Sequence, residues 1–367
     1  MHLKKEQGWR SNEGKKQLLT LKPYVPGKSI EEVKKETGLT KIVNLASNEN
    51  PFGCSEKVSE ALSAFSKYAH YPDSRARQLR EKVANHLGVK QNQLLFSSGL
   101  DEMIQIISRC LLSEETNVVM ASLTFPQYRH HAIIENVEIR EVPLKEGRHD
   151  LEGMQKAVDE RTSIVWICNP NNPTGTYVNE KELRRFLEQI PKDTLVILDE
   201  AYYEYVTVTD FPESISLIRE YKNSLVLRTF SKAYGLASFR IGYAIGNEVL
   251  MEKLDVCRLP FNTSSFAQIA AQTALTDNTF VKRSSLVNQK GLQQYYSFCD
   301  EYNVQYYPSQ GNFIYIKPDK NLEEVFQYLF HRGYIVHPTK GGIRTTISSV
   351  EDNNGIISLL TEMLIED

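Results

Sequence analysis

The residues best suited to chemistry lie between Thr229 and Arg240, directly after the short apolar run 225–227. Thr229 and Ser231 carry hydroxyl groups and Arg240 carries a guanidinium, a set that matches the oxygens of a dianionic phosphate. Lys232 stands among them, and a lysine amine can form an imine with an aldehyde. The combination predicts a site for pyridoxal 5'-phosphate (PLP), which carries both an aldehyde and a phosphate.

Other polar or aromatic residues follow further apolar runs. Asp199 ends the run 195–198, where a carboxylate could pair with the ring nitrogen of PLP and keep it protonated. Asn172, in a loop fixed by two prolines, and Tyr202 could together hold the phenolic oxygen of the ring. Phe125 could stack on the ring, although an aromatic residue in such a place more often belongs to the core.

Two further features suggest anion binding. The turn 97–102 joins a predicted strand to a predicted helix through a glycine, and the free amides of a helix start can bind phosphate. Arg344 lies within the apolar run 343–347, and a buried guanidinium needs an anionic partner. That partner is either a substrate carboxylate or phosphate, or a structural carboxylate of the protein.

The elements that must position these residues alternate along the chain. Short apolar runs at 94–96, 118–120, 164–167, 195–198, 225–227 and 241–245 are separated mostly by helical patterns. This order predicts an α/β fold with a large, mostly parallel sheet covered by helices on both faces. Ligands collect at the carboxyl ends of such strands, where the motifs fall.

The pattern changes near residue 269, where helices and strands form a smaller α+β group. We therefore expect a large domain over residues 44–268 and a small domain over 269–367. Residues 1–43 are expected to form an N-terminal segment that joins the small domain.

Composition limits the classes of function. The 367-residue chain has a formal net charge of -3, which gives no general attraction to nucleic acid or to an anionic membrane surface. No apolar run is long enough for a membrane-spanning helix. The five cysteines are scattered without a CxxC pair, which argues against a metal site and a disulfide framework and favours the cytoplasm.

Taken together, the motifs resemble those of the class II aminotransferases of the fold-type-I PLP family, over nearly the whole chain. TFSKAYG at Thr229, NPNNPTG at Asn169, DEAY at Asp199 and the distal Arg344 occur in the order of that family. Within the family the chain is most similar to the histidinol-phosphate aminotransferases. That similarity rests on four segments: LKPYVPGKSIEEV from Leu21, LASNENPFG from Leu45, HYPD from His70 and SSGLDE from Ser97.

The resemblance implies a role for each matching residue. Lys232 would bind the cofactor aldehyde and move a proton, Asp199 would pair with the ring nitrogen, and Phe125 would stack on the ring. The phenolate oxygen would be held by Asn172 and Tyr202. The cofactor phosphate would be bound by Thr229, Ser231, Arg240, the backbone amides of Leu100 and Asp101, and Tyr71 from the other subunit of a homodimer with shared sites. Tyr24 and Arg344 would bind the substrate.

The implied reaction is the reversible transfer of an amino group from glutamate to imidazole-acetol phosphate, giving histidinol phosphate and 2-oxoglutarate in histidine biosynthesis. One position departs from the subgroup, because His337 stands where a second substrate-binding arginine is usual, before a short loop at 338–342. With an ordinary pKa near ~6.5, His337 would lose its charge between pH 6.5 and 8.

Three alternatives remain open: an aromatic amino acid aminotransferase, a PLP-dependent lyase or decarboxylase, and a non-catalytic PLP-binding regulator. The intact lysine and the lack of an appended DNA-binding domain weigh against the regulator.

Overall fold

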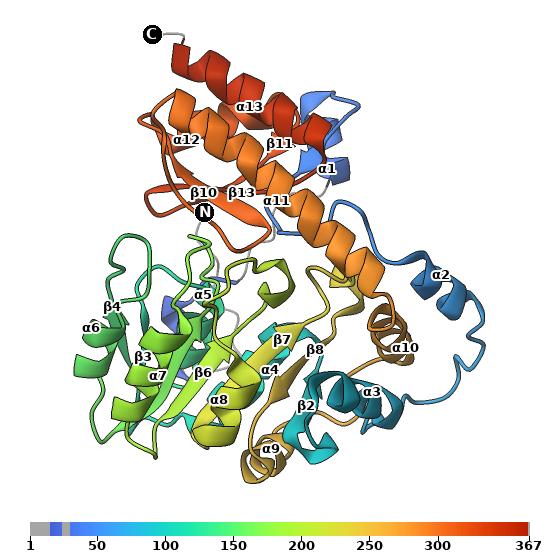
Figure 1. Ribbon diagram of the computed structural model, residues 1–367, viewed down its shortest axis with the longest axis vertical. Coiled ribbons are helices and arrows are strands. Elements are labelled where there is room, and N and C mark those ends of the chain that lie inside the picture. The colour runs from blue at the N-terminus through green and yellow to red at the C-terminus, as the bar shows by residue number, and fades with distance from the viewer. Residues whose placement is uncertain (1–14, 24–29, 366–367) are drawn as a thin grey trace, which may run out of the picture.

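The structure, a computed structural model, describes residues 15–23 and 30–365. Its lower part in Figure 1 is built on a seven-stranded sheet in the order β2-β8-β7-β6-β5-β3-β4. The strands are β2 (Leu94–Ser97), β3 (Asn117–Ala121), β4 (Glu138–Val142), β5 (Thr162–Cys168), β6 (Leu195–Asp199), β7 (Ser224–Thr229) and β8 (Gly242–Ile245). The predicted α/β fold with a mostly parallel sheet is confirmed.

Strand β8 is the exception to the parallel arrangement. It runs antiparallel to both of its neighbours, so that Gly242, its first residue, pairs with Thr229 of β7 and with Ser97 of β2. The start of β8 therefore lies at the sheet edge where the other strands end. This reversal brings the residues just before β8 to the same edge.

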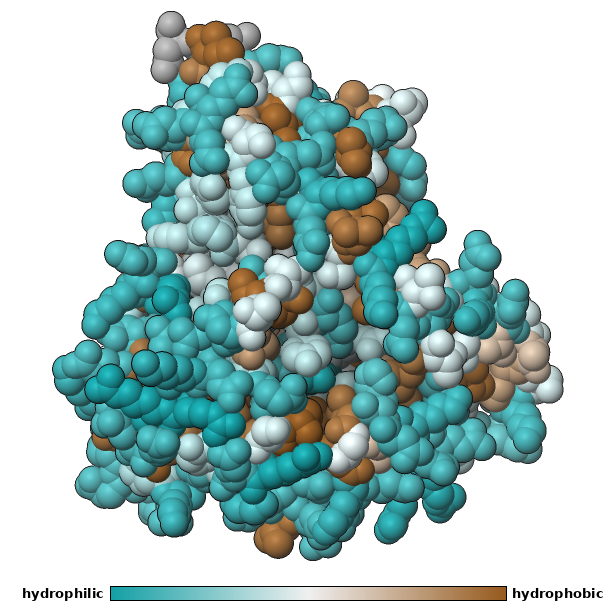
Figure 2. Space-filling view, in the orientation of Figure 1, coloured by the Kyte–Doolittle hydropathy of each residue, from teal (hydrophilic) through white to brown (hydrophobic). Residues whose placement is uncertain are grey.

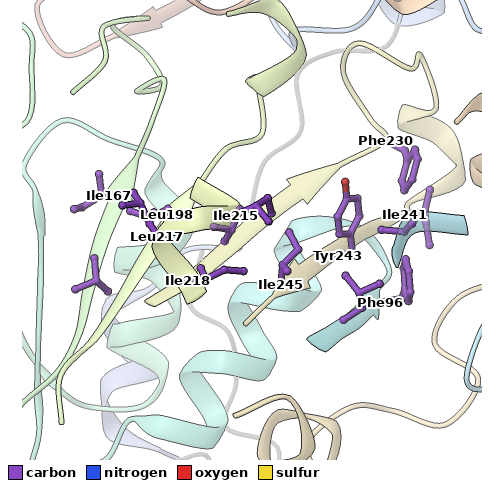
Figure 3. Packing of buried hydrophobic residues seen from close by; sticks show 14 of the residues in the cluster. Phe96, Ile167, Leu198, Ile215, Leu217, Ile218, Phe230, Ile241, Tyr243 and Ile245 are labelled. Carbon is purple, nitrogen blue, oxygen red and sulfur yellow. The ribbon is translucent and has the colours of Figure 1, made fainter. Parts of the chain in front are cut away.

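Helices cover both faces of the sheet, because alternate strand residues point to opposite sides. Val165, Ile167 and Leu198 belong to one buried cluster, whereas Trp166 and Ile197 belong to the cluster on the other face. Figure 3 shows the first cluster, where side chains from the sheet meet those of α8.

On the first face lie α2 (Glu56–Ser63), α3 (Arg77–Leu87), α6 (Leu151–Lys156), α7 (Glu180–Gln189), α8 (Ser214–Glu220) and α10 (Ser265–Ala274). On the second lie α4 (Gly99–Leu111), α5 (Pro126–Ile134) and α9 (Glu248–Asp255). The 3-10 helices are η1 (Lys16–Thr20), η2 (Gln91–Gln93), η3 (Tyr203–Tyr205) and η4 (Ala237–Phe239).

The upper part in Figure 1 contains a four-stranded antiparallel sheet in the order β12-β13-β10-β9 and a separate buried cluster. Its strands are β9 (Gln305–Tyr307), β10 (Phe313–Lys317), β12 (His337–Thr339) and β13 (Gly342–Thr346). Its helices are α1 (Ile30–Thr37), α12 (Leu322–Phe330) and α13 (Val350–Ile365), while the long α11 (Asn278–Glu301) rises to it from beside α10.

The N-terminal region meets this upper part through a short parallel pair. β1 (Val43–Asn44) pairs with β11 (Tyr334–Ile335), and Leu45 also donates its amide to the Ile335 carbonyl. The pair places residues 43–45 beside residues 334–335. The proposed domain boundaries at residues 44 and 269 stay a prediction.

The face in Figure 2 is largely hydrophilic, with small scattered apolar areas. None of the helices within residues 15–23 and 30–365 is long and apolar enough to cross a membrane. Over the same residues, no group of three or more His, Cys, Asp or Glu side chains is arranged to hold a metal ion.

The sequence patterns locate the buried strands well but miss three others, one of which is β1, only two residues long. They do not predict β4, because its sequence EIREV is polar and the strand lies at the sheet edge, partly exposed. They do not predict β12 either, since it contains Pro338 and forms the edge of the small sheet.

Candidate active site

Six predicted site segments meet at one edge of the large sheet. β2, β3, β5, β6 and β7 all end there, and each is followed by residues that the motifs singled out. Arg240 joins them from the opposite direction, because it precedes the antiparallel β8. Parallel topology thus gathers residues from positions 97 to 240 into a single site.

The hydroxyls of Thr229 and Ser231 form the base of the predicted phosphate site. Thr229 Oγ1 lies 3.0 Å from Ser231 Oγ, and Arg240 Nη1 lies 3.4 Å from the same Ser231 oxygen. Arg240 Nη2 also lies 3.3 Å from a carboxylate oxygen of Asp101, in the first turn of α4. The Arg240 guanidinium therefore lies between the two hydroxyls and the start of α4, and these are the kinds of hydrogen-bond donors that bind phosphate.

Backbone geometry brings the arginine close to the start of α4. Gly99 has a φ of +74°, and a Cβ at this position would lie only 2.4 Å from Arg240 Nη2. Arg240 itself has a φ of 52°, a left-handed conformation that is uncommon for a residue with a side chain. Glycine at 99 thus leaves the space that the guanidinium occupies.

Lys232 lies beside this site, immediately after Ser231. Its Nζ donates to the Ser47 carbonyl oxygen at 2.9 Å. Burial, and then the nearby Arg344 guanidinium, lower the pKa of Lys232 to about 8. A larger share of the amine is therefore uncharged near neutral pH than in an ordinary lysine, which is the form that attacks an aldehyde.

Asp199 is buried at the end of β6, with 3% of its surface exposed. One carboxylate oxygen accepts the Tyr128 hydroxyl at 2.5 Å, and the other accepts the Ala201 amide at 3.2 Å. Burial raises the pKa of Asp199 to about 6, and the two hydrogen bonds oppose that rise. The carboxylate has lone pairs left for a cationic partner.

A hydrogen-bonded network joins the large sheet to the small one. The Tyr202 hydroxyl accepts from Asn172 Nδ2 at 3.3 Å and from Asn48 Nδ2 at 3.0 Å. Arg344 Nη1 donates to Asn172 Oδ1 at 2.6 Å, and Nη2 donates to the Ala46 carbonyl. Arg344, which the resemblance assigns to substrate binding, thus lies next to Asn172.

His337 lies beside Arg344 on the neighbouring strand. The two residues are directly opposite in the register of β12 and β13. Although His337 is exposed, desolvation of its ring and then the Arg344 charge lower the pKa of His337 to about 4. The imidazole is therefore already neutral at pH 6.5, and the charge loss expected between pH 6.5 and 8 does not follow from this structure.

The structure leaves the roles of three predicted residues untested. Phe125 caps the start of α5 and is half-buried, so its stacking role stays a prediction. Tyr71 is 82% exposed and stacks on Phe261 with ring centroids 4.7 Å apart, and its role in a partner subunit also stays a prediction. Tyr24 lies outside the described residues.

Sequence reasoning assigns no role to two buried contributors. Asn48 lies in the LASNENPFG segment and holds both Tyr202 and Thr346, whose hydroxyl accepts the Asn48 backbone amide at 3.0 Å. The sequence signal for Asn48 is that its segment is too polar to form a buried strand. Tyr128 is the other, and its helical position gives no signal for its contact with Asp199.

Comparisons with known proteins agree with the fold and with the family that the motifs resemble. The family model "Aminotransferase class I and II" matches residues 40–357. A relative from Bacillus cereus (strain ATCC 10987 / NRS 248) named histidinol-phosphate aminotransferase 1 is 60% identical over 358 residues, covering 96% of this chain and 97% of the relative.

Solved structures give the same result at the level of the fold. The histidinol-phosphate aminotransferase of Sinorhizobium meliloti, solved in complex with PLP, superposes with a TM-score of 0.87 at 25% identity, over 96% of this chain and 98% of that one. The L-threonine-O-3-phosphate decarboxylase of Porphyromonas gingivalis superposes with a TM-score of 0.77 at 22% identity, over 88% of this chain and 99% of that one. The fold alone therefore does not separate a transferase from a lyase.

Proposed function

Because the chain belongs to the class I and II aminotransferases, we propose that it uses PLP to transfer an amino group from glutamate to imidazole-acetol phosphate. The products are histidinol phosphate and 2-oxoglutarate, and the reaction is reversible. The 60% identity to a histidinol-phosphate aminotransferase over 96% of the chain favours this substrate over an aromatic amino acid and favours transfer over decarboxylation.

The donor set at the sheet edge fits PLP. Thr229, Ser231, Arg240 and the first amides of α4 would hold the phosphate, and the close approach of Arg240 to Gly99 supports this assignment. Asn172 and Tyr202 would hold the phenolate oxygen, Asp199 would pair with the ring nitrogen, and Phe125 would cover the ring. When bound, PLP supplies an aldehyde that captures amines and a protonated ring that accepts electrons from the substrate carbon.

Lys232 performs the proton movements. When free, its Nζ would accept the proton from the substrate carbon that bears the amino group. The same Nζ would later donate that proton again, so that one side chain serves as both base and acid. Burial beside Arg344, which lowers the pKa of Lys232 to about 8, increases the share of the amine that can act as a base near neutral pH.

Arg344 would bind the anionic group of either substrate. It is fixed on β13 and hydrogen-bonded to Asn172, so a carboxylate or phosphate bound there would lie beside the ring-binding residues. Tyr24 would complete this contact. His337, opposite Arg344, would contribute one neutral hydrogen bond where the related enzymes place a charge.

We also propose that the enzyme is a cytoplasmic homodimer with shared active sites. Tyr71 stacks on Phe261 and Tyr68 stacks on Phe266, and all four rings are exposed, which supports burial against a second copy. Tyr71 of each copy would then contact the cofactor phosphate of the other.

The proposed function is tested by an end-point assay with histidinol phosphate and 2-oxoglutarate. Glutamate should form in the wild type loaded with PLP and not in Lys232→Ala. Borohydride treatment of the loaded wild type should attach the cofactor to the peptide that contains Lys232. Absence of glutamate in the loaded wild type, or attachment of the cofactor to another lysine, would contradict the proposal.

A further inference from the structure

Tyr128 touches the catalytic carboxylate, yet it belongs to none of the motifs that mark the site. It lies in α5 and is completely buried. Its hydroxyl donates to Asp199 Oδ2 at 2.5 Å, which is short for a hydrogen bond between two oxygens. The contact crosses from a helix on one face of the sheet to the end of β6.

The ring of Tyr128 is fixed by two other aromatic side chains. It stacks on Trp166 of β5, with centroids 4.4 Å apart and an interplanar angle of 9°. It also makes an edge contact with Phe125 at 5.6 Å and 78°. Because packing limits the rotation of the ring, the hydroxyl is held toward Asp199.

The hydrogen bond acts on the charge of Asp199. Burial raises the pKa of Asp199 to about 6, and donation from Tyr128 is the largest opposing effect. Burial and the Asp199 charge raise the pKa of Tyr128 well above its ordinary value, so the phenol keeps its proton and stays a donor. The carboxylate is thereby stabilised against taking up a proton in a dry environment.

We propose that Tyr128 is a positioning residue that holds Asp199 ionised and correctly oriented toward the ring nitrogen of the cofactor. This inference rests on the proposed function, since it assigns Asp199 to that nitrogen. Without the hydroxyl, Asp199 binds a proton more tightly, and the proton shared with the ring nitrogen moves toward the carboxylate. The ring then accepts electrons less well, and proton removal from the substrate slows.

Tyr128→Phe removes the hydroxyl and keeps the ring that stacks on Trp166. Loss of one hydrogen bond to a charged group predicts a fall in kcat of roughly 10- to 100-fold, with little change in KM. Tyr295→Phe is the matched control, because Tyr295 is equally buried but lies in the separate core of the upper part. Its kcat should equal that of the wild type.

Trp166→Phe provides a second test that keeps the Tyr128 hydroxyl. Trp166 Nε1 has no hydrogen-bond partner within the described part of the chain, so the change weakens the stacking without breaking a bond of the indole. We expect a smaller fall in kcat than in Tyr128→Phe. If Tyr128→Phe does not fold, the kcat and the Asp199 titration of Trp166→Phe decide the question.

Titration separates positioning from a general loss of structure. In the cofactor-free chain, carbon-13 NMR of labelled aspartate should show Asp199 titrating near pH 6, identified by its absence in Asp199→Asn. The midpoint should move upward in Tyr128→Phe, by less in Trp166→Phe, and not at all in Tyr295→Phe. The midpoint of the pH dependence of the bound cofactor's visible band should shift in the same order among these variants.

Two results would overturn the inference: a folded Tyr128→Phe with the kcat of the wild type, or a fall in kcat with both titrations unchanged. If Tyr128→Phe does not fold, an unchanged Asp199 midpoint in Trp166→Phe would overturn it. The aspartate titration needs no cofactor, so it tests the Tyr128 contact even if the wild type fails to transfer amino groups. That failure would contradict the proposed function instead.

Discussion

Gly99→Ala tests whether the space beside the start of α4 is needed to place Arg240. The new Cβ would lie 2.4 Å from Arg240 Nη2 and 2.9 Å from Cζ, so the guanidinium must move. The side chain of Arg240 is 44% exposed and can turn toward solvent at small energetic cost. The expected damage is therefore loss of the guanidinium from the phosphate site rather than loss of the fold.

The magnitude follows from the lost contact. One hydrogen bond between charged groups contributes about 1.5–3 kcal/mol, which predicts a Kd for PLP higher by roughly 10- to 150-fold. Alanine at a φ of +74° also costs about 1–2 kcal/mol of folding free energy, partly offset by the lower entropy of its unfolded chain. Equilibrium dialysis of PLP and urea unfolding of the cofactor-free protein measure the two effects separately.

Gly38→Ala is the matched control. Gly38 has a φ of +72°, almost the same as Gly99, but a Cβ added there would have no atom within 4 Å. The two variants should lose similar stability, and only Gly99→Ala should lose affinity for PLP. Equal affinities in the two variants would refute the argument that Gly99 makes room for Arg240.

Four further predictions address other parts of the site. Asp199→Asn should still bind PLP but lose roughly a thousandfold or more in kcat, about 4 kcal/mol of barrier; a loss within tenfold would make the carboxylate merely structural. The rate at which the cofactor-free chain captures PLP should rise with pH around a midpoint near 8, because the neutral amine reacts and the pKa of Lys232 is lowered from 10.5 to about 8. Stopped-flow absorbance measures this rate, and a midpoint near 10.5 would contradict the prediction. Mixing Lys232→Ala chains with Tyr71→Phe chains should form some heterodimers with one intact site, so activity should rise above that of Tyr71→Phe alone. If the subunits exchange and activity does not rise, the sites are not shared. His337→Arg should lower KM for histidinol phosphate roughly 10- to 100-fold at pH 8 by adding a charged bond, with little change for tyrosine, whereas identical KM values would place His337 outside the substrate site.

Much of the fold is predictable because its strands are buried on both faces. Runs such as 164–167 and 195–198 are continuously apolar, and they are the central strands β5 and β6. Parallel topology then requires residues after successive strands to meet, which accounts for the grouping of Asn172, Asp199 and Lys232.

The parts that the sequence does not predict depend on contacts that a local pattern does not contain. β4 is an edge strand whose exposed polar residues hide its hydrogen bonding to β3. Tyr128 looks like any apolar position of a helix, and only the packing of α5 against β5 and β6 directs its hydroxyl to Asp199. The low pKa of His337 likewise depends on desolvation of its ring and then on the register that places it opposite Arg344, neither of which a local pattern contains.

The most direct test of the central claim follows the amino group itself. Glutamate labelled with nitrogen-15 and imidazole-acetol phosphate are incubated with the PLP-loaded protein, and the products are analysed by mass spectrometry. We predict that the label appears in histidinol phosphate and that 2-oxoglutarate forms in equal amount. Label that appears only when an aromatic keto acid replaces imidazole-acetol phosphate, or no transfer of label at all, would contradict the account.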